Sequence, residues 1–288
     1  MSSDLMAAVE ALYRSTDEAQ RKEANQWLMS FSKRAEAWEG ARALLSDPAK
    51  DVQYFGANMF FVKVRSEWYG MPETTKVSVY SGLQQLVLQL SSHESRGWHR
   101  LSAAGKRLCL TLAAAAVRSV SKADIFVRDA LMMHAGSSSG APVAVELLTA
   151  LPQEVLDHEE QAQSSVTERM SGEARPEMRA LLPQVLAALQ ATLLQAGDNA
   201  ECGTACFKAM QHWMQLRAGG SLLLLVESFP QLLATCLDAL AAQDQQLNAA
   251  AADALVELLS GHNSQLSIGS EAAAAATRPV AERFHLRG

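Results

Sequence analysis

Turn signals and polar breaks recur along the chain and separate about a dozen apolar segments that group in pairs. Most of these segments are about ten to twenty residues long, the usual length of a helix in a globular protein. Six such pairs in about 260 residues give an average unit of about 40 to 45 residues, a period inferred from the pairing of the segments alone. The predicted pairs are 3–14 with 17–33, 35–45 with 51–68, 72–91 with 95–118, 122–133 with 141–155, a long helix ending near 196 with 200–217, and 221–240 with 243–260.

The amino-acid composition favours helices in these segments. Hydrophobic residues make up 49% of the 288-residue chain, and Ala and Leu supply most of that share. Runs of β-branched residues are nearly absent and Gly and Pro are sparse, which is a helix-forming mixture. A repeat of about 40 to 45 residues is typical of HEAT and armadillo units and too long for tetratricopeptide or ankyrin units. We therefore predict an all-α fold, a right-handed α-solenoid of about six HEAT-like helical hairpin repeats.

Two prolines, Pro183 and Pro230, fall within apolar helical patterns. A proline inside a helix removes one backbone donor and clashes with the preceding turn. Each proline is therefore expected to kink its helix or to split it.

The segment DVQYFGANMFFVKVRSEWYGMP, residues 51–72, carries six aromatic residues. On a helix, its apolar side chains form two stripes separated by two polar strips. A helix with two apolar faces is covered from both sides, by its own partner and by the neighbouring repeat, so the aromatics are predicted to be mostly core. The stripes are Val52, Phe55, Met59 and Val62, and Tyr54, Ala57, Phe61, Val64 and Trp68; the strips hold Asp51, Asn58 and Arg65, and Gln53, Lys63 and Glu67.

The charge of the chain weighs against nucleic acid or an anionic membrane surface as a partner. The formal net charge is −6 and the pI is near 5.7, whereas either partner requires a basic face that displaces counterions. Lys63 and Arg65 lie on different strips, so they form no basic face beside the aromatics. The longest apolar runs, LTLAAAAV and SLLLLV, are far shorter than a membrane span. An acidic surface would attract a basic protein partner, although solubility alone also explains an acidic surface.

The cysteines and histidines do not form a metal or catalytic motif. Cys202 and Cys206 share a helix face, and His212 is the only further ligand candidate nearby. This pattern lacks the spacing of zinc sites, so all four cysteines, which include Cys109 and Cys236, are expected to be reduced, buried thiols. No GxSxG, P-loop, HExxH or GxGxxG motif occurs, so no enzyme activity, cofactor or metal is predicted. The N-terminus lacks the basic start and hydrophobic block of a signal peptide.

Several segments resemble importin-beta-like nuclear transport receptors, the karyopherins. YFGANMFFVKV followed by EWYGMP is similar to the second repeat of that family's N-terminal domain. AVEALYRSTDEAQRKEANQWLMSF resembles the opening of the domain, and AEAWEGARALLSD resembles its next helix. VELLTALPQEV at 145–155 resembles a fourth-repeat segment of the transportin-SR branch, as FKAMQHWMQL and NAAAADALVELL do more loosely. The resemblance spans residues 5–260 and implies the N-terminal portion of such a receptor.

The chain departs from the family pattern at two positions and at its end. Phe61 stands where the branch tends to carry a basic residue, and Gly56 replaces a usual alanine, which would weaken the helix by about 0.5–1 kcal/mol. Family members are much longer, so the solenoid is expected to be truncated relative to the family. The expected domains are 1–120, with the N-terminal HEAT repeats and by resemblance the Ran-binding region, 121–265, with further HEAT-like repeats, and 266–288, an irregular or incomplete C-terminal tail.

The resemblance implies a monomeric receptor that shuttles between cytoplasm and nucleus and imports protein cargo. The small GTPase Ran in its GTP form would regulate it, and the implied cargo is Arg/Ser-rich splicing-type proteins. Grooves between adjacent helices can hold aromatic peptide anchors, so nucleoporin Phe-Gly repeats are a further expected partner. A solenoid binds through exposed side chains of its inner helices, so the predicted Ran contacts are polar positions of the early second helices, Asn25, Asn58, Lys63 and Arg65.

Two other interpretations stay open. The chain could be a HEAT-repeat interaction scaffold without transport activity, or a truncated receptor that binds Ran or pore proteins without carrying cargo. Nucleotide-dependent Ran binding separates a receptor from a scaffold. For each single polar position, plain solvated surface is an equally good interpretation.

Overall fold

The computed structural model describes residues 3–92, 98, 100–119, 123–136, 140–161, 165–216 and 221–266. Within these ranges the regular secondary structure is helical, with no β-strand. The chain divides into two compact units, residues 1–120 and 121–288, each of which is a stack of helical hairpins. The prediction of an all-α fold of HEAT-like hairpins is therefore confirmed. From residue 267 onward, the predicted tail lies outside the described residues.

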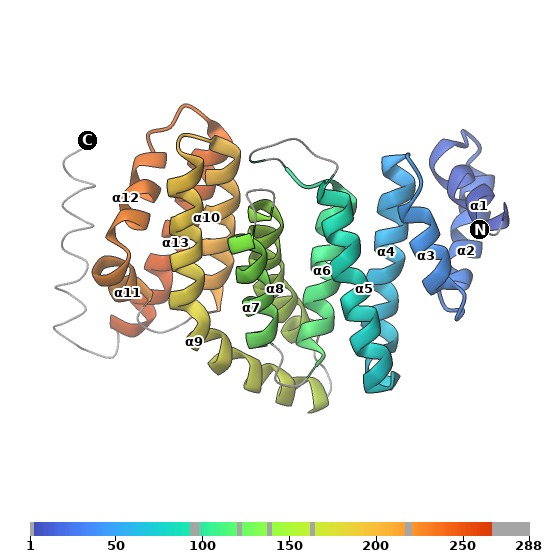
Figure 1. Ribbon diagram of the computed structural model, residues 1–288, viewed down its shortest axis with the longest axis horizontal. Helices are drawn as coiled ribbons and strands as arrows, with labels where there is room; N and C mark the ends of the chain where they lie inside the picture. Colours follow the sequence, from blue (N-terminus) through green and yellow to red (C-terminus); the bar gives the residue numbers. More distant parts are fainter. Residues whose placement is uncertain are drawn as a thin grey trace. The chain divides into compact units, whose positions relative to one another are not determined.

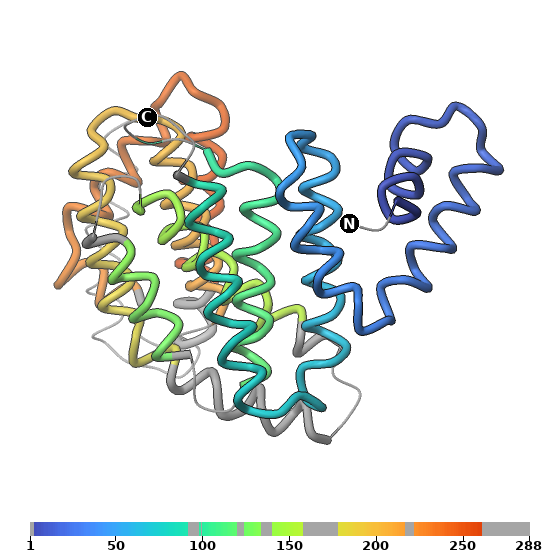
Figure 2. Tube along the Cα trace, turned by 45° about the vertical axis from the view of Figure 1, so that its right-hand side comes forward, coloured from blue at the N-terminus to red at the C-terminus, as the bar shows by residue number. Residues whose placement is uncertain are grey.

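The first unit consists of three helical hairpins (Figure 1). The second helices α4 and α6 also pack on each other, and α5 and α6 lie side by side in both views (Figures 1 and 2). A short 3-10 turn, η1 (Trp68–Gly70), follows α4. The hairpins are α1 (Ser3–Arg14) with α2 (Glu18–Phe31), α3 (Ala37–Leu45) with α4 (Lys50–Glu67), and α5 (Glu73–Ser92) with α6 (Ala103–Val117).

The second unit repeats this arrangement in residues 123–136, 140–161, 165–216 and 221–266. Its first helices pack in the order α7, α9, α12, and its second helices pack in the order α8, α10, α13. The hairpins are α7 (Ala123–Gly136) with α8 (Ala141–Gln161), α9 (Ser165–Ala196) with α10 (Ala200–Gln215), and α11 (Ser221–Ser228) and α12 (Pro230–Ala239) with α13 (Gln245–Leu266).

The two prolines in apolar helical patterns behave differently. Pro230 is the first residue of α12, and the axes of α11 and α12 differ by 107° across it. The predicted split at Pro230 is therefore confirmed. Pro183 lies inside α9, which continues through it without a break. No single helix in the described ranges is long and apolar enough to cross a membrane, and α11 and α12 reach that length and composition only together, as a bent pair.

Helix α4 is covered on two sides, as the two-stripe pattern predicts. Val52, Ala57, Val64 and Trp68 are each at most 2% exposed, because α4 packs on α3 and also on α6. Trp68 follows the helix, and its indole Nε1 donates a hydrogen bond of 2.9 Å to Ser119 Oγ. Of the six aromatic residues, Phe60, Phe61 and Trp68 are buried, Tyr54 and Phe55 are half-buried, and Tyr69 is 51% exposed.

The contact areas of α3 and α6 on α4 adjoin each other along one side of the helix. Helix α4 therefore has one exposed polar strip, where the sequence predicts two. Of the predicted polar residues on the covered side, Lys63 is fully buried, while Gln53 and Glu67 are half-buried. Val62 is 44% exposed, so its predicted place in the core is wrong. Val62 lies one helical turn after Asn58 and therefore on the same side of α4, which is the exposed side.

Helices α3 and α4 approach each other closely at Gly56. A Cβ atom at this position would lie 2.7 Å from the carbonyl oxygen of Ala41 and 2.9 Å from Leu44 Cβ. These atoms belong to the α3 backbone or are attached directly to it, so they can give way only if α3 moves. The glycine, which the sequence alone marks as a weak point of the helix, is therefore what permits this packing distance.

Substituting Gly56→Ala tests this close approach. Alanine raises intrinsic helix propensity by roughly 1 kcal/mol, but we expect overpacking against α3 to lower the free energy of unfolding by about 1–3 kcal/mol net. Urea unfolding followed by circular dichroism measures the change. Gly70→Ala is the control, because nothing lies within 4 Å of a Cβ there, and we expect a change within about 0.5 kcal/mol. A more stable Gly56→Ala protein would contradict the close packing.

Candidate functional site

The exposed strip of α4, taken with exposed residues of the other two second helices α2 and α6, is the candidate partner-binding surface of the first unit. Helix α6 packs directly on α4, whereas the first hairpin contacts α4 mainly through α1. Asn58, Val62 and Arg65 are spaced four and three residues apart, so they lie along one side of α4. Two large apolar side chains are among the exposed members, since Met29 is 60% exposed and Val62 is 44% exposed. We call this surface the second-helix face; its residues are Asn25 and Met29 on α2, Asn58, Val62 and Arg65 on α4, and Arg107 on α6.

Two arginines from different helices meet on one aromatic ring within this face. The guanidinium carbon of Arg65 lies 5.1 Å from the centroid of the Phe61 ring, and that of Arg107 lies 4.9 Å from it. Arg107 also donates a hydrogen bond of 2.8 Å to the Tyr54 hydroxyl. A guanidinium has five N–H donors, and cation–π contact with a ring leaves those at its edge able to bind other acceptors. This arginine cluster can therefore bind carboxylate, phosphate or carbonyl groups of a partner.

The arginine cluster gives Phe61 a role, although Phe61 occupies a position where the resembled branch tends to be basic. Phe61 carries no charge, but its ring holds two guanidinium groups. Sequence reasoning missed Arg107, which reaches α4 only because α6 packs on it. One signal could have found it: Arg107 follows Arg65 by 42 residues, close to the length of one repeat.

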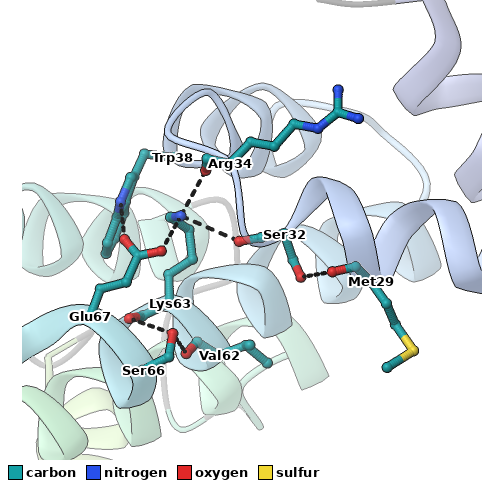
Figure 3. A network of polar contacts seen from close by, with 8 residues as sticks. All are labelled: Met29, Ser32, Arg34, Trp38, Val62, Lys63, Ser66 and Glu67. Atoms are coloured by element: carbon teal, nitrogen blue, oxygen red, sulfur yellow. Dashed lines mark hydrogen bonds and ion pairs between the residues drawn. The ribbon is translucent and has the colours of Figure 1, made fainter.

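Lys63 does not belong to the second-helix face. Its side chain is fully buried, and its ammonium donates hydrogen bonds to the carbonyl oxygens of Ser32 at 3.3 Å and Arg34 at 2.8 Å (Figure 3). It also forms an ion pair of 2.7 Å with Glu67 Oε1. The prediction that Lys63 offers its charge to a partner is therefore wrong, because all its donors are used inside the unit.

Glu67 extends this contact into a network that includes Trp38 (Figure 3). Its second carboxylate oxygen accepts a hydrogen bond of 3.2 Å from Trp38 Nε1, and the Lys63 ammonium lies 5.4 Å from the centroid of the Trp38 ring. Ser32 is the C-cap of α2, where helix carbonyls lack intrahelical donors. The Lys63 network therefore ties the end of α2 and the start of α3 to α4.

The other predicted contact residues are accessible to different degrees. Asn25 is exposed, and Asn58 and Arg65 are half-buried. The structure places Asn58 and Arg65 together on α4 and Asn25 on the preceding second helix. Their contact with Ran stays a prediction.

The two units carry opposite formal charges. Residues 1–120 contain 15 Lys and Arg against 12 Asp and Glu, a formal charge of +3, and residues 121–288 contain 10 against 19, a formal charge of −9. Long-range attraction depends on the local sign of charge. The first unit therefore suits an acidic partner surface and the second a basic one.

The cysteine and histidine candidates of the second unit are packing residues of α10. The Cys202 and Cys206 sulfur atoms are 4.0 Å apart and buried, and all four cysteines are buried thiols, as expected. His212 instead lies 3.4 Å from both the Thr149 carbonyl oxygen and the Gln153 side-chain amide. In the part of the chain that the structure describes, no group of three or more His, Cys, Asp and Glu residues could hold a metal ion.

Comparison with known proteins assigns the chain to a family. Stacked helical hairpins are the architecture of helical-repeat proteins, which bind partners along their exposed helices. Residues 105–255 match the exportin 1-like protein family, Xpo1; this is more than half of the chain, which belongs to that family. Transportin MOS14 of Arabidopsis thaliana is 25% identical over 221 residues, 74% of this chain and 21% of that relative. The resemblance to importin-beta-like karyopherins of the transportin type is thus confirmed, and the chain spans about a fifth of that relative's length.

Replacing Lys63 tests the buried network. We expect Lys63→Met to lower the free energy of unfolding by about 2–4 kcal/mol, because the Ser32 carbonyl oxygen loses its donor, the Arg34 carbonyl oxygen keeps only the 3.3 Å bond from Ala37 N–H, and Glu67 loses its counter-ion. Urea unfolding measures the loss. Lys22→Met, at an exposed position of α2, is the matched control and should change stability by no more than about 0.5 kcal/mol. Equal unfolding midpoints for the two variants would show that the network does not stabilise the unit.

The environment of His212 predicts a pH dependence of the second unit. Burial lowers the pKa of His212 below its ordinary value of 6.5, although the Thr149 carbonyl opposes this. Because the unfolded chain binds the proton more readily, this contribution to stability is fully present above about pH 6.5 and declines as the pH falls toward the lowered pKa. Thermal unfolding between about pH 8 and 5 should show a smaller loss for His212→Gln than for the parent. An unchanged pH dependence would rule out His212 as its source.

Proposed function

We propose that this chain is part of a nuclear transport receptor that binds Ran in its GTP form through the second-helix face of the first unit. The observation that carries the proposal is the arginine cluster, in which Arg65 and Arg107 share the Phe61 ring on a chain of the karyopherin family. Successive second helices of a repeat protein offer one continuous set of side chains to a folded partner. The cluster supplies charged donors to that set.

Exposed apolar residues on α2 and α4 support binding to a protein rather than to a small ion. Met29 and Val62 are large and accessible, and protein interfaces combine such apolar side chains with arginine at their energetic centres. Asn25 and Asn58 add polar groups on the same helices. The face therefore has the composition of a protein interface.

The charge of the second unit supports the proposed cargo. A formal charge of −9 attracts Arg-rich segments over distances of about a Debye length, roughly 8–10 Å. We infer that the receptor imports Arg/Ser-rich proteins, binds nucleoporin Phe-Gly repeats and acts as a monomer that shuttles between cytoplasm and nucleus. The proposed activity is binding, without catalysis, cofactor, nucleic acid or membrane.

Calorimetric titration of the full chain with Ran tests the proposal. We expect binding to Ran loaded with a non-hydrolysable GTP analogue and none to Ran loaded with GDP. Arg107→Ala and Val62→Glu should each weaken binding at least about tenfold, which corresponds to about 1.4 kcal/mol. Val77→Glu is the control for Val62→Glu, because Val77 is a 57% exposed valine on α5, outside the second-helix face.

The opposite result would favour another interpretation. Equal binding to both nucleotide forms, or none, by a protein that circular dichroism shows to be helical would leave an interaction scaffold without transport activity. Ran binding without retention of an Arg/Ser-rich peptide would favour a truncated, non-carrying receptor, since the chain spans about a fifth of its relative. Beads bearing Phe-Gly peptides test the pore-protein contact separately.

A further inference from the structure

An open groove of about 660 Å³ lies between the first helices α3 and α5 of the first unit. Its floor includes Phe60, which is 5% exposed, and Leu83, which is 1% exposed. Phe60 and Val62 project from opposite sides of α4, so this groove is distinct from the second-helix face. Its lining includes Trp38, Glu39 and Arg42 of α3, Phe60 of α4, and Val79 and Leu83 of α5.

The groove has the length of a short peptide segment. Its lining follows α5 from Thr75 to Leu86, which at 1.5 Å per residue is about 16 Å. An extended chain advances about 3.3 Å per residue, so roughly five residues fit along it. A volume of this size lies within the usual range of ligand sites.

The aromatic part of the groove is held in place before any ligand binds. The rings of Trp38 and Phe60 are 5.7 Å apart between centroids and tilted by 51°. The Trp38 indole is fixed by its hydrogen bond to Glu67. A fixed aromatic surface binds an apolar side chain without the entropy cost of ordering its own rotamers.

One guanidinium at the groove has no acceptor in the described part of the chain. Arg42 is exposed and makes no hydrogen bond or ion pair with the described residues. Its Nη2 atom lies 3.2 Å from the position that a Cβ of Gly82 would occupy, so the side chain reaches from α3 to α5 across the edge of the groove. Glycine at this point of α5 leaves room for it. Arg42 can therefore form a bidentate pair with a carboxylate at the side of the groove.

The charges along α3 also give a ligand one preferred direction. Glu39 lines the same groove one helical turn before Arg42. A carboxylate is attracted at Arg42 and repelled at Glu39. A bound segment would therefore place its acidic residue toward Arg42 and leave a neutral or basic residue near Glu39.

We propose that the α3–α5 groove binds a short peptide segment of a partner protein that carries an aromatic or leucine side chain next to a carboxylate. The apolar side chain packs on Trp38 and Phe60, and the carboxylate pairs with Arg42. This site adds a second binding surface to the first unit, and it does not depend on Ran binding at the second-helix face.

Fluorescence polarisation of the full chain with labelled seven-residue peptides tests the site. One set carries Phe or Leu anchors with Asp at each position in turn, and the matched set has Asn in place of Asp. We expect the best Asp peptide to bind about tenfold more tightly than its Asn counterpart. Arg42→Gln should abolish this preference, whereas Arg21→Gln, at an exposed arginine of α2, should retain it. Binding by no peptide, equal binding of both sets, or equal binding of a neutral Phe-Gly peptide would overturn the proposal.

Two valines of α5 form a matched pair of test positions, one inside the groove and one outside it. Val79 lines the groove, whereas Val77 does not and is 57% exposed. We expect Val79→Asp to weaken the best peptide at least about tenfold and Val77→Asp to leave it unchanged. If Val79→Asp lowers the unfolding temperature, Ser78→Trp at the exposed rim serves instead, because the indole would occupy the groove. Equal affinities for the groove variant and for Val77→Asp would place the peptide elsewhere. The peptide assay contains no GTPase, so its result does not depend on whether the chain binds Ran.

Discussion

Burial of α4 from two directions is the constraint on which the first unit depends. On the α3 side, the absence of a side chain at Gly56 permits close approach, and the Lys63 network fixes the linker that leads into α3. On the α6 side, Phe61 receives Arg107, and Trp68 bonds to Ser119. Because these contacts occupy most of the circumference of α4, one strip is left exposed. The packing that stabilises the unit therefore also decides which side chains a partner can reach.

The order and pairing of the helices could be predicted because turn residues and apolar periodicity are local features of the sequence. The errors at Lys63 and Val62, and the packing role of Gly56 that the sequence does not reveal, share a different cause. A lysine is expected at the surface unless acceptors surround it, and the carbonyl of Arg34 lies 29 residues away from Lys63. The distance between α3 and α4 likewise decides whether Gly56 weakens or permits the packing. Arg107 reaches Phe61 only through the pairing of two repeats, which helix periodicity does not report.

The net charge of the whole chain also conceals a difference between its two units. The value of −6 averages a first unit of +3 and a second unit of −9. Exposed charges interact over about 8–10 Å at physiological salt, so a partner senses the unit that it contacts rather than the whole chain. The acidic total therefore did not reveal that arginines gather on α4 and α6. Two units of opposite charge fit a protein that binds two chemically different partners.

Trp38 connects the stability of the first unit with its groove. The same indole donates to Glu67 in the Lys63 network and lines the α3–α5 groove with its ring. Rotating the ring away from the groove would break the bond to Glu67, which also pairs with Lys63. The buried network therefore keeps the groove open at its aromatic end, and a ligand need not supply the free energy to form it. Since the carbonyls bound by Lys63 belong to the α2–α3 linker, the groove is positioned by the joint between the first two hairpins rather than by α3 and α5 alone.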